Sequence, residues 1–385
     1  MPVSNRARYA VYLLAFGLAA LILGVGVFVV TERYIERQRP VTLVYRPHPF
    51  RRQVLVPEQK YQRGRVAFDI GPHGWRGSEP EMPKPPGTLR IIALGGSSVF
   101  DHLVTGGASW PERIGPLLQG NMAEPLRDLG WTRVESYNGG VPGYSSRETL
   151  ATYHDLAARY APDLVLFYLG WNDAKYMVPF LEGADPDRYY SYRGAFEAQY
   201  RFLLAPRPWR NLAALGKMWT ARVGALAENR SAVAEKARVS RLDWDHTPGL
   251  EYWRRNVRAF GERVLQDGAL PVFIAQNTLT VPGLSPELRK RVVYRYVGLE
   301  HDALVAVNEA MVRGLAAEAA GLSVPFLDLR GGINGREDFF SDHVHMKAAG
   351  SEAFARALAE ALERVLPRLA ASTSTAGRTS APGSP

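Results

Sequence analysis

The residue in this chain best placed for chemistry is a serine that follows a short, buried-type run. Residues 90–94 read Arg-Ile-Ile-Ala-Leu, and Gly95, Gly96, Ser97 and Ser98 follow directly. An apolar, β-branched run that stops at glycines is typical of a buried parallel strand and a tight turn. A serine at the start of the next helix lies beside backbone N–H groups without partners in that helix, which suits a nucleophile whose reaction develops an oxyanion. From this stretch alone, a simple helix N-cap is an equally good interpretation.

Ester hydrolysis by serine needs further groups, and the sequence contains candidates for each. A serine hydroxyl is a weak nucleophile that needs a base, and a histidine base needs a carboxylate to orient it. Asp342 and His345 are three residues apart on one predicted loop and could supply both. The backbone N–H of Ser97, the N–H of Gly143 and the side-chain amide of Asn172 could stabilise the oxyanion.

An alternation of strands and helices must position these groups. Strand-like runs alternate with helix-like segments, which indicates an α/β fold with a parallel sheet and helices on both faces. Ser97, Gly143 and Asn172 follow three successive predicted strands, so they should meet at the carboxyl edge of the sheet, where ligands bind in open α/β folds. The predicted strands are 90–94, 133–138, 163–169, 270–276 and 324–329, and the predicted helices are 110–129, 146–160, 251–266, 299–320 and 347–366.

Four short motifs, in this order, resemble the SGNH/GDSL hydrolases, in the branch whose first block reads G-G-S-S. They are Gly95-Gly96-Ser97-Ser98, Asn138-Gly139-Gly140-Val141-Pro142-Gly143-Tyr144, Gly170-Trp171-Asn172-Asp173 and Asp342-His343-Val344-His345, and a similar lead-in stands at Gly74-Trp75-Arg76-Gly77. The resemblance spans about residues 71–366. It implies a three-layer α/β/α fold with a five-stranded flavodoxin-like sheet, Ser97 as nucleophile, Asp342 and His345 as its triad partners, and Ser97, Gly143 and Asn172 as oxyanion donors.

The motifs leave several alternatives open. Ser98 could replace Ser97 as nucleophile, and His343 could replace His345 as base, although the register favours Ser97 and the adjacent side chains of Asp342 and His343 should diverge. A metal site at 342–345 is a further alternative, but the triad explains the motif more fully. No metal or cofactor is therefore expected.

Residues beside the motifs have less certain roles. The first block lacks the aspartate of G-D-S, because Gly96 stands in its place. Asp173 is expected to brace the turn that carries Asn172. His102 is expected at the surface or in the pocket lining, and Asp101 is expected to start a helix rather than to act as a second acid. The possible pocket-lining residues are Gly96, Ser98, Asn138, Tyr144, Trp171 and Asp173.

The amino-acid composition excludes several classes of function. The chain has 385 residues, 46% of them hydrophobic, a formal net charge of +9 and no cysteine. The lack of cysteine excludes disulfides, thiolate metal sites and a cysteine nucleophile. The positive charge is spread along the chain without a compact basic block, so nucleic-acid binding is not predicted.

The N-terminal region indicates membrane attachment. Residues 9–30 form an apolar run without charge, long enough to cross a bilayer as a helix. A signal peptide or a buried helix are the alternatives, but Val-Val-Thr-Glu offers no small-residue cleavage site. The prediction is an anchor at 1–31, an extended linker with one edge strand at 32–70, a hydrolase domain at 71–368 with a possible lid at 174–245, and a disordered tail at 369–385. The catalytic domain is expected outside the cytoplasm.

The sequence thus predicts a serine esterase acting on an O-acyl or O-acetyl ester of a small molecule, glycan or lipid. An O-acyltransferase that modifies an envelope glycan or lipid is the first alternative, because a pocket that excludes water could pass the acyl group to a hydroxyl. An inactive binding module is the second. The sequence does not indicate the acyl group, the alcohol or the oligomeric state.

Overall fold

A parallel five-stranded sheet forms the centre of the catalytic region. The computed structural model describes residues 5–38, 43, 45–183, 243–367 and 369. The strands are β5 (Thr88–Gly95), β6 (Arg133–Asn138), β7 (Leu164–Tyr168), β8 (Leu270–Ile274) and β9 (Phe326–Leu327). Their order is β6-β5-β7-β8-β9 and all four pairings are parallel. This is the flavodoxin-like order, so the predicted fold class is confirmed.

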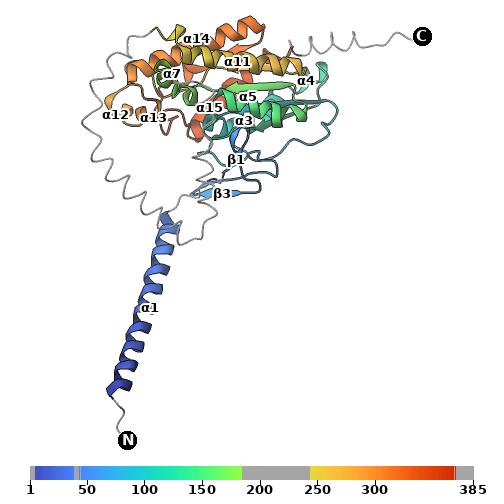
Figure 1. Ribbon diagram of the computed structural model, residues 1–385. Helices are drawn as coiled ribbons and strands as arrows, with labels where there is room; N and C mark the ends of the chain where they lie inside the picture. The colour runs from blue at the N-terminus through green and yellow to red at the C-terminus, as the bar shows by residue number, and fades with distance from the viewer. Residues whose placement is uncertain (1–4, 39–42, 44, 184–242, 368, 370–385) are drawn as a thin grey trace. The chain divides into compact units, whose positions relative to one another are not determined.

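Helices cover both faces of this sheet, as the alternating pattern predicted. On one face α3 (Trp110–Asn121) packs against α15 (Ala348–Glu363), and on the other α5 (Ser146–Thr152), α11 (Pro248–Gln266) and α14 (His301–Leu322) pack together (Figure 1). All residues of β5 and β7 are buried, which explains the apolar sequence of β7 and the apolar run 91–94 within β5. The sheet thereby carries the ends of β5, β6 and β7 to one edge.

Short elements complete the described part of this region. Residues 110–129 were expected as one helix, but they form α3 and a separate α4 (Ala123–Asp128), divided at Met122. The helix that begins at Ser146 continues to Tyr160 as a π-helical and a 3₁₀ turn, η1 (Tyr153–Ala157) and η2 (Ala158–Tyr160). The remaining elements are α2 (Ser97–Phe100), α6 (Trp171–Ala174), α7 (Met177–Leu181), η4 (Trp244–His246), α12 (Pro286–Arg289), α13 (Tyr294–Val297) and η5 (Arg330–Gly332).

The segment before the sheet is more ordered than the sequence predicted. Extended chain with one edge strand was expected, but two antiparallel hairpins form, β1 (Tyr45–His48) with β2 (Arg52–Leu55) and β3 (Lys60–Arg63) with β4 (Val66–Asp69). Leu55, Tyr61, Phe68 and Ile70 share a small apolar cluster with residues of the later loops. This long-range packing is what makes the hairpins, and a polar local sequence cannot reveal it.

The N-terminal apolar run forms a single helix, α1 (Asn5–Gln38), in a compact unit of its own. Its segment Val11–Val30 is long and apolar enough to cross a membrane, and that segment is entirely exposed. Such a helix occurs both in signal sequences and in membrane anchors. Most of the predicted insertion and nearly all of the predicted tail lie outside the described residues.

Candidate active site

The proposed nucleophile lies where β5 meets the short helix α2. Gly96 has extended backbone before the helix, and Ser97 is its first residue. Ser97 is partly exposed, whereas Ser98 is buried and its hydroxyl accepts a hydrogen bond from Gln276 Nε2 at 2.9 Å. Asn138 is fully buried and braces this turn, because its amide donates to the carbonyl of Val99 at 2.9 Å. The two adjacent serines therefore have different environments, and only Ser97 faces an ionisable side chain.

That side chain is His345, which lies between Ser97 and Asp342. His345 Nε2 is 2.7 Å from Ser97 Oγ, and His345 Nδ1 is 2.6 Å from Asp342 Oδ2. The other carboxylate oxygen, Oδ1, accepts the backbone N–H groups of Val344 and His345, both at 3.0 Å. Burial opposes the charge of Asp342, but the hydrogen bond and charge of His345 outweigh it and hold the carboxyl pKa well below its ordinary range. Asp342 is thus an anion that orients the imidazole.

Two further histidines lie beside Asp342 and His345 but do not join the row of hydrogen bonds from Ser97 to Asp342. His343 packs on the indole of Trp171 with ring centroids 3.7 Å apart, and its Nδ1 lies 3.7 Å from Asp342 Oδ1, beyond hydrogen-bonding distance. His102 meets the ring of His345 edge-on at 4.5 Å. Burial, followed in the case of His102 by the charge of His345, lowers the pKa of both His343 and His102 to about 4. Both rings are therefore neutral at pH 7.

Gly143 and Asn172 lie at the same edge of the sheet as Ser97. Gly143 has φ +86°, in the left-handed region that favours glycine. The amide of Asn172 donates from Nδ2 to the carbonyl of Tyr144 at 2.9 Å. A Cβ added to Gly96 would lie 2.6 Å from that same Nδ2 and 2.9 Å from the Tyr144 oxygen. The Asn172 amide therefore lies directly over the residue before Ser97, in space that a side chain at position 96 would fill.

The remaining motif residues serve mainly to hold these groups. Tyr144 is fully buried, and Asp173 is 2% exposed. Both Asp173 oxygens accept the N–H of Ser146, at 3.0 and 3.1 Å, and Oδ1 accepts its hydroxyl at 2.6 Å. Burial raises the pKa of Asp173 to about 7, against the opposing effect of these bonds. Asp173 thus ties the Asn172 turn to the start of α5.

Asp101, considered as a helix-start residue, ends α2 instead. It adopts φ +58° and accepts the backbone N–H of Trp110 at 3.2 Å and the hydroxyl of Ser351 at 2.5 Å. The contact to Ser351 joins the nucleophile turn to α15.

Sequence reasoning missed three side chains that hold the site. The hydroxyl of Tyr296 donates to Asn172 Oδ1 at 3.2 Å and accepts from Lys175 Nζ at 3.3 Å. Gln276 bridges the turns, because its Oε1 accepts the Trp171 N–H at 2.6 Å while its Nε2 donates to Ser98. A polar residue two positions after the end of β8 was a usable signal for Gln276, since strand ends at this edge carry sites. Nothing in the sequence around Tyr296 marks it.

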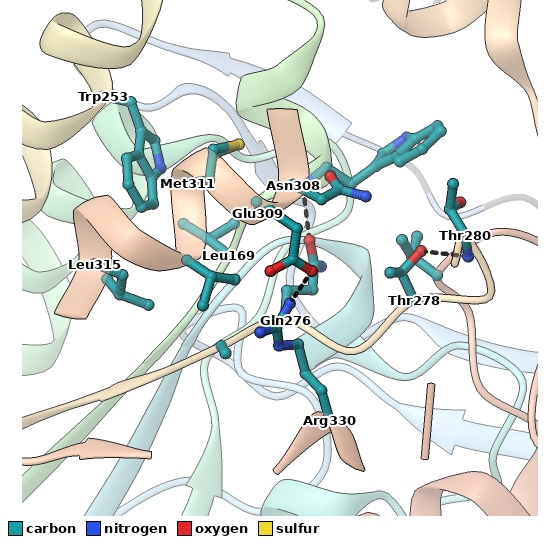
Figure 2. A pocket seen from close by; sticks show the side chains of 15 residues that line it. Leu169, Trp253, Gln276, Thr278, Thr280, Asn308, Glu309, Met311, Leu315 and Arg330 are labelled. Carbon is teal, nitrogen blue, oxygen red and sulfur yellow. Dashed lines mark hydrogen bonds and ion pairs between the residues drawn. The ribbon is translucent and has the colours of Figure 1, made fainter. Parts of the chain in front are cut away.

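A small pocket lies behind Gln276. Its lining includes Leu169, Trp171, Trp253, Gln276, Met311 and Val344, with the ion pair of Glu309 and Arg330 across it (Figure 2). None of Ser97, Asp342 and His345 lines it. Its free space of about 20 Å³ has room for roughly one or two waters, which is too small for an ester substrate.

Known proteins offer only distant comparisons. No family profile matches the chain, and no curated protein matches it. Similar solved structures include a variant of Axe2, an acetyl-xylooligosaccharide esterase from Geobacillus Stearmophilus, at 14% identity and a TM-score of 0.41, covering 70% of this chain and 92% of that one. A putative lipolytic protein of the G-D-S-L family from Desulfitobacterium hafniense is 11% identical with a TM-score of 0.37, covering 71% and 98%. TesA is 16% identical with a TM-score of 0.38, covering 70% and 95%.

These neighbours are esterases and GDSL-type proteins at low identity. The fold assignment rests on the strand order and parallel register of this chain itself. Within the described residues, no group of three or more His, Cys, Asp or Glu side chains is arranged to hold a metal ion.

Proposed function

We propose that this chain is a serine esterase of the SGNH type, in the branch with a G-G-S-S first block, and that it hydrolyses an O-acyl or O-acetyl ester. The observation that carries the proposal is the hydrogen-bonded chain from Ser97 Oγ through His345 to Asp342, at 2.7 and 2.6 Å. A serine hydroxyl bonded to a neutral imidazole is an activated nucleophile, and the carboxylate stabilises the imidazolium that forms.

The proposed reaction has two halves. Ser97 Oγ bonds to the ester carbonyl carbon while its proton passes to His345 Nε2. The tetrahedral intermediate collapses, and His345 returns the proton to the departing alcohol, which leaves Ser97 acylated. Water, deprotonated by His345, then attacks the acyl-enzyme, and His345 returns the proton to Ser97 Oγ as the bond to the acyl group breaks and the acid is released. Each half passes through a tetrahedral intermediate that carries an oxyanion, for which we assign the backbone N–H groups of Ser97 and Gly143 and the Asn172 amide as donors.

The critical test compares Ser97→Ala with the wild-type chain on short p-nitrophenyl esters. We expect turnover to fall by roughly 10³-fold or more, because removal of a triad member leaves only the oxyanion donors and binding. We also expect a fluorophosphonate probe to label the wild type and not the variant. Undiminished turnover in a folded Ser97→Ala protein contradicts the assignment. Added glycan acceptors distinguish hydrolysis from acyl transfer, because a transferase forms acylated glycan in place of free acid.

For α1 we propose a retained membrane anchor that holds the catalytic domain outside the cytoplasm. Its 20-residue apolar segment, Val11–Val30, supports the anchor. A membrane-impermeant fluorophosphonate probe should label Ser97 in intact cells as strongly as in permeabilised cells. Labelling that requires permeabilisation contradicts the orientation, and recovery of a shortened chain from the soluble fraction contradicts the anchor.

A further inference from the structure

The strand β2 contacts the loop that carries Gly143. Arg52 Nη2 donates to the Gly143 carbonyl at 2.8 Å, and Gln53 Nε2 donates to the Pro142 carbonyl at 3.1 Å. In return, the hydroxyl of Tyr144 donates to the backbone carbonyl of Gln53 at 2.5 Å. Two consecutive residues of β2 therefore hold three consecutive residues of the loop, across about ninety positions of sequence.

The bonds that Arg52 and Gln53 donate are partly buried, and the bond that Tyr144 donates is buried. Tyr144 is fully buried, and Gln53 and Val141 are each 6% exposed. Tyr144 and Val141 belong to the same apolar cluster as Leu55, the residue that ends β2. Hydrogen bonds in a low-dielectric environment are stronger, and leaving one of their partners unsatisfied costs about 1–3 kcal/mol. The loop is thus held by bonds that are costly to break.

The guanidinium of Arg52 also reaches the other end of this loop. Its Nε lies 3.7 Å from Glu148 Oε1, and the other oxygen of Glu148 accepts the N–H and hydroxyl of Ser145 in a capping box that begins α5. One cation therefore links the Gly143 peptide to the first turn of the following helix. Burial lowers the pKa of Arg52, but Glu148, Tyr176 and Tyr296 together outweigh it, so that the pKa is raised above its ordinary value.

Arg52 makes these contacts from a strained backbone conformation. Its φ is +59°, in the left-handed region, which costs a non-glycine residue roughly 1–3 kcal/mol. Strain of this kind persists only where surrounding contacts over-determine it, and the contacts of Arg52 include those to the loop and to Glu148.

Gly143 itself has no side chain with which to anchor its peptide. We propose that Arg52 and Gln53 are positioning residues that fix the two peptides on either side of Gly143. Gln53 bonds the Pro142 carbonyl, which shares its peptide with the Gly143 N–H that we assign to the oxyanion, and Arg52 bonds the following peptide. The inference rests on the proposed function, because the loop matters for catalysis only if Gly143 is an oxyanion donor. It makes the segment between the apolar helix and the sheet a part of the active site rather than a spacer.

The test uses the full chain in detergent and two variants, each of which removes one hydrogen-bond donor to the loop. Gln53→Met removes the bond to Pro142 while keeping size, charge and the carbonyl that accepts from Tyr144. Arg52→Met removes the bond to Gly143, and Arg52→Lys keeps the charge beside Glu148. Arg46→Met is the matched control, since Arg46 is an exposed arginine on the partner strand β1.

We expect each Met variant at 52 or 53 to lower kcat by roughly 10- to 100-fold with KM little changed, because a displaced oxyanion donor acts in the transition state. The affinity for a trifluoromethyl ketone, which forms the oxyanion on Ser97, should fall by the same factor. Arg52→Lys should recover part of both losses, and Arg46→Met should match the wild type. Hydrogen–deuterium exchange should rise in residues 139–146 and stay unchanged in β7 and β8.

Loop exchange at the wild-type rate in both Met variants overturns the inference, and so does a kcat loss without a matching loss of ketone affinity. If Arg52→Met does not fold, Gln53→Met decides alone. A wild-type chain that neither turns over esters nor reacts with fluorophosphonate overturns the proposed function instead, and the exchange experiment then still shows whether β2 holds the loop.

Discussion

Replacement of Gly96 by alanine tests the arrangement of the site most directly. The backbone at Gly96 is extended, so alanine introduces no conformational penalty there. Its Cβ, however, would lie 2.6 Å from Asn172 Nδ2. Because carbon and nitrogen atoms in contact normally stay about 3.5 Å apart, the Asn172 amide must retreat by roughly 1 Å.

A shift of that size should be visible in the kinetics. A misplacement of about 1 Å, or the loss of one oxyanion donor, costs on the order of 100-fold in rate. We therefore expect Gly96→Ala to lower kcat roughly 100-fold on a short p-nitrophenyl ester, with KM close to wild type. The added methyl group should also lower the free energy of unfolding by about 1–3 kcal/mol, measured by urea denaturation.

Gly261→Ala is the matched control, because it introduces a steric clash in the core away from the proposed site. Gly261 lies within α11, and its Cβ would meet Leu322 Cδ1 at 2.5 Å and Phe273 Cζ at 2.9 Å, in the core. We expect a similar loss of stability and an unchanged kcat. A kcat of Gly96→Ala within about twofold of wild type would refute the placement of Asn172, and so would an equal kcat loss in Gly261→Ala.

Four other substitutions test neighbouring contacts. Tyr296→Phe should lower kcat roughly fivefold with little change in KM or unfolding temperature, because Asn172 loses one hydrogen bond; kinetics indistinguishable from wild type would exclude that role. His345→Ala should lower kcat by roughly 10³-fold or more and His343→Ala by less than about tenfold, whereas the reverse ranking would make His343 the base. The pKa of Asp173 is raised from 3.8 to about 7, so the folded state binds the Asp173 proton more tightly than the unfolded state does. The free energy of unfolding should therefore fall as pH rises from about 4 to 7, by on the order of 4 kcal/mol. Urea unfolding across that range should show the slope in wild type and not in Asp173→Asn, and equal slopes would refute the raised pKa.

Local chemistry in the sequence was sufficient for the fold class and for the candidate residues. Buried parallel strands are continuous apolar runs, and β5 and β7 are both fully buried. Asp342 and His345 contact each other three residues apart on one loop, so their hydrogen bond was predictable from spacing. The glycine at position 96 appeared in the sequence only as a missing carboxylate, and the structure shows that the Asn172 amide occupies that space.

Tertiary structure decided what holds those residues in place. The contact of Ser97 with His345 spans 248 positions, that of Tyr296 with Asn172 spans 124, and that of Arg52 with Gly143 spans 91. The first was inferred because both partners stand in recognisable motifs at one sheet edge. The other two were not, because Arg52 and Tyr296 lie in segments without periodicity or motif. Their contacts depend on how separate loops pack over the sheet, and single-chain patterns carry no record of that packing.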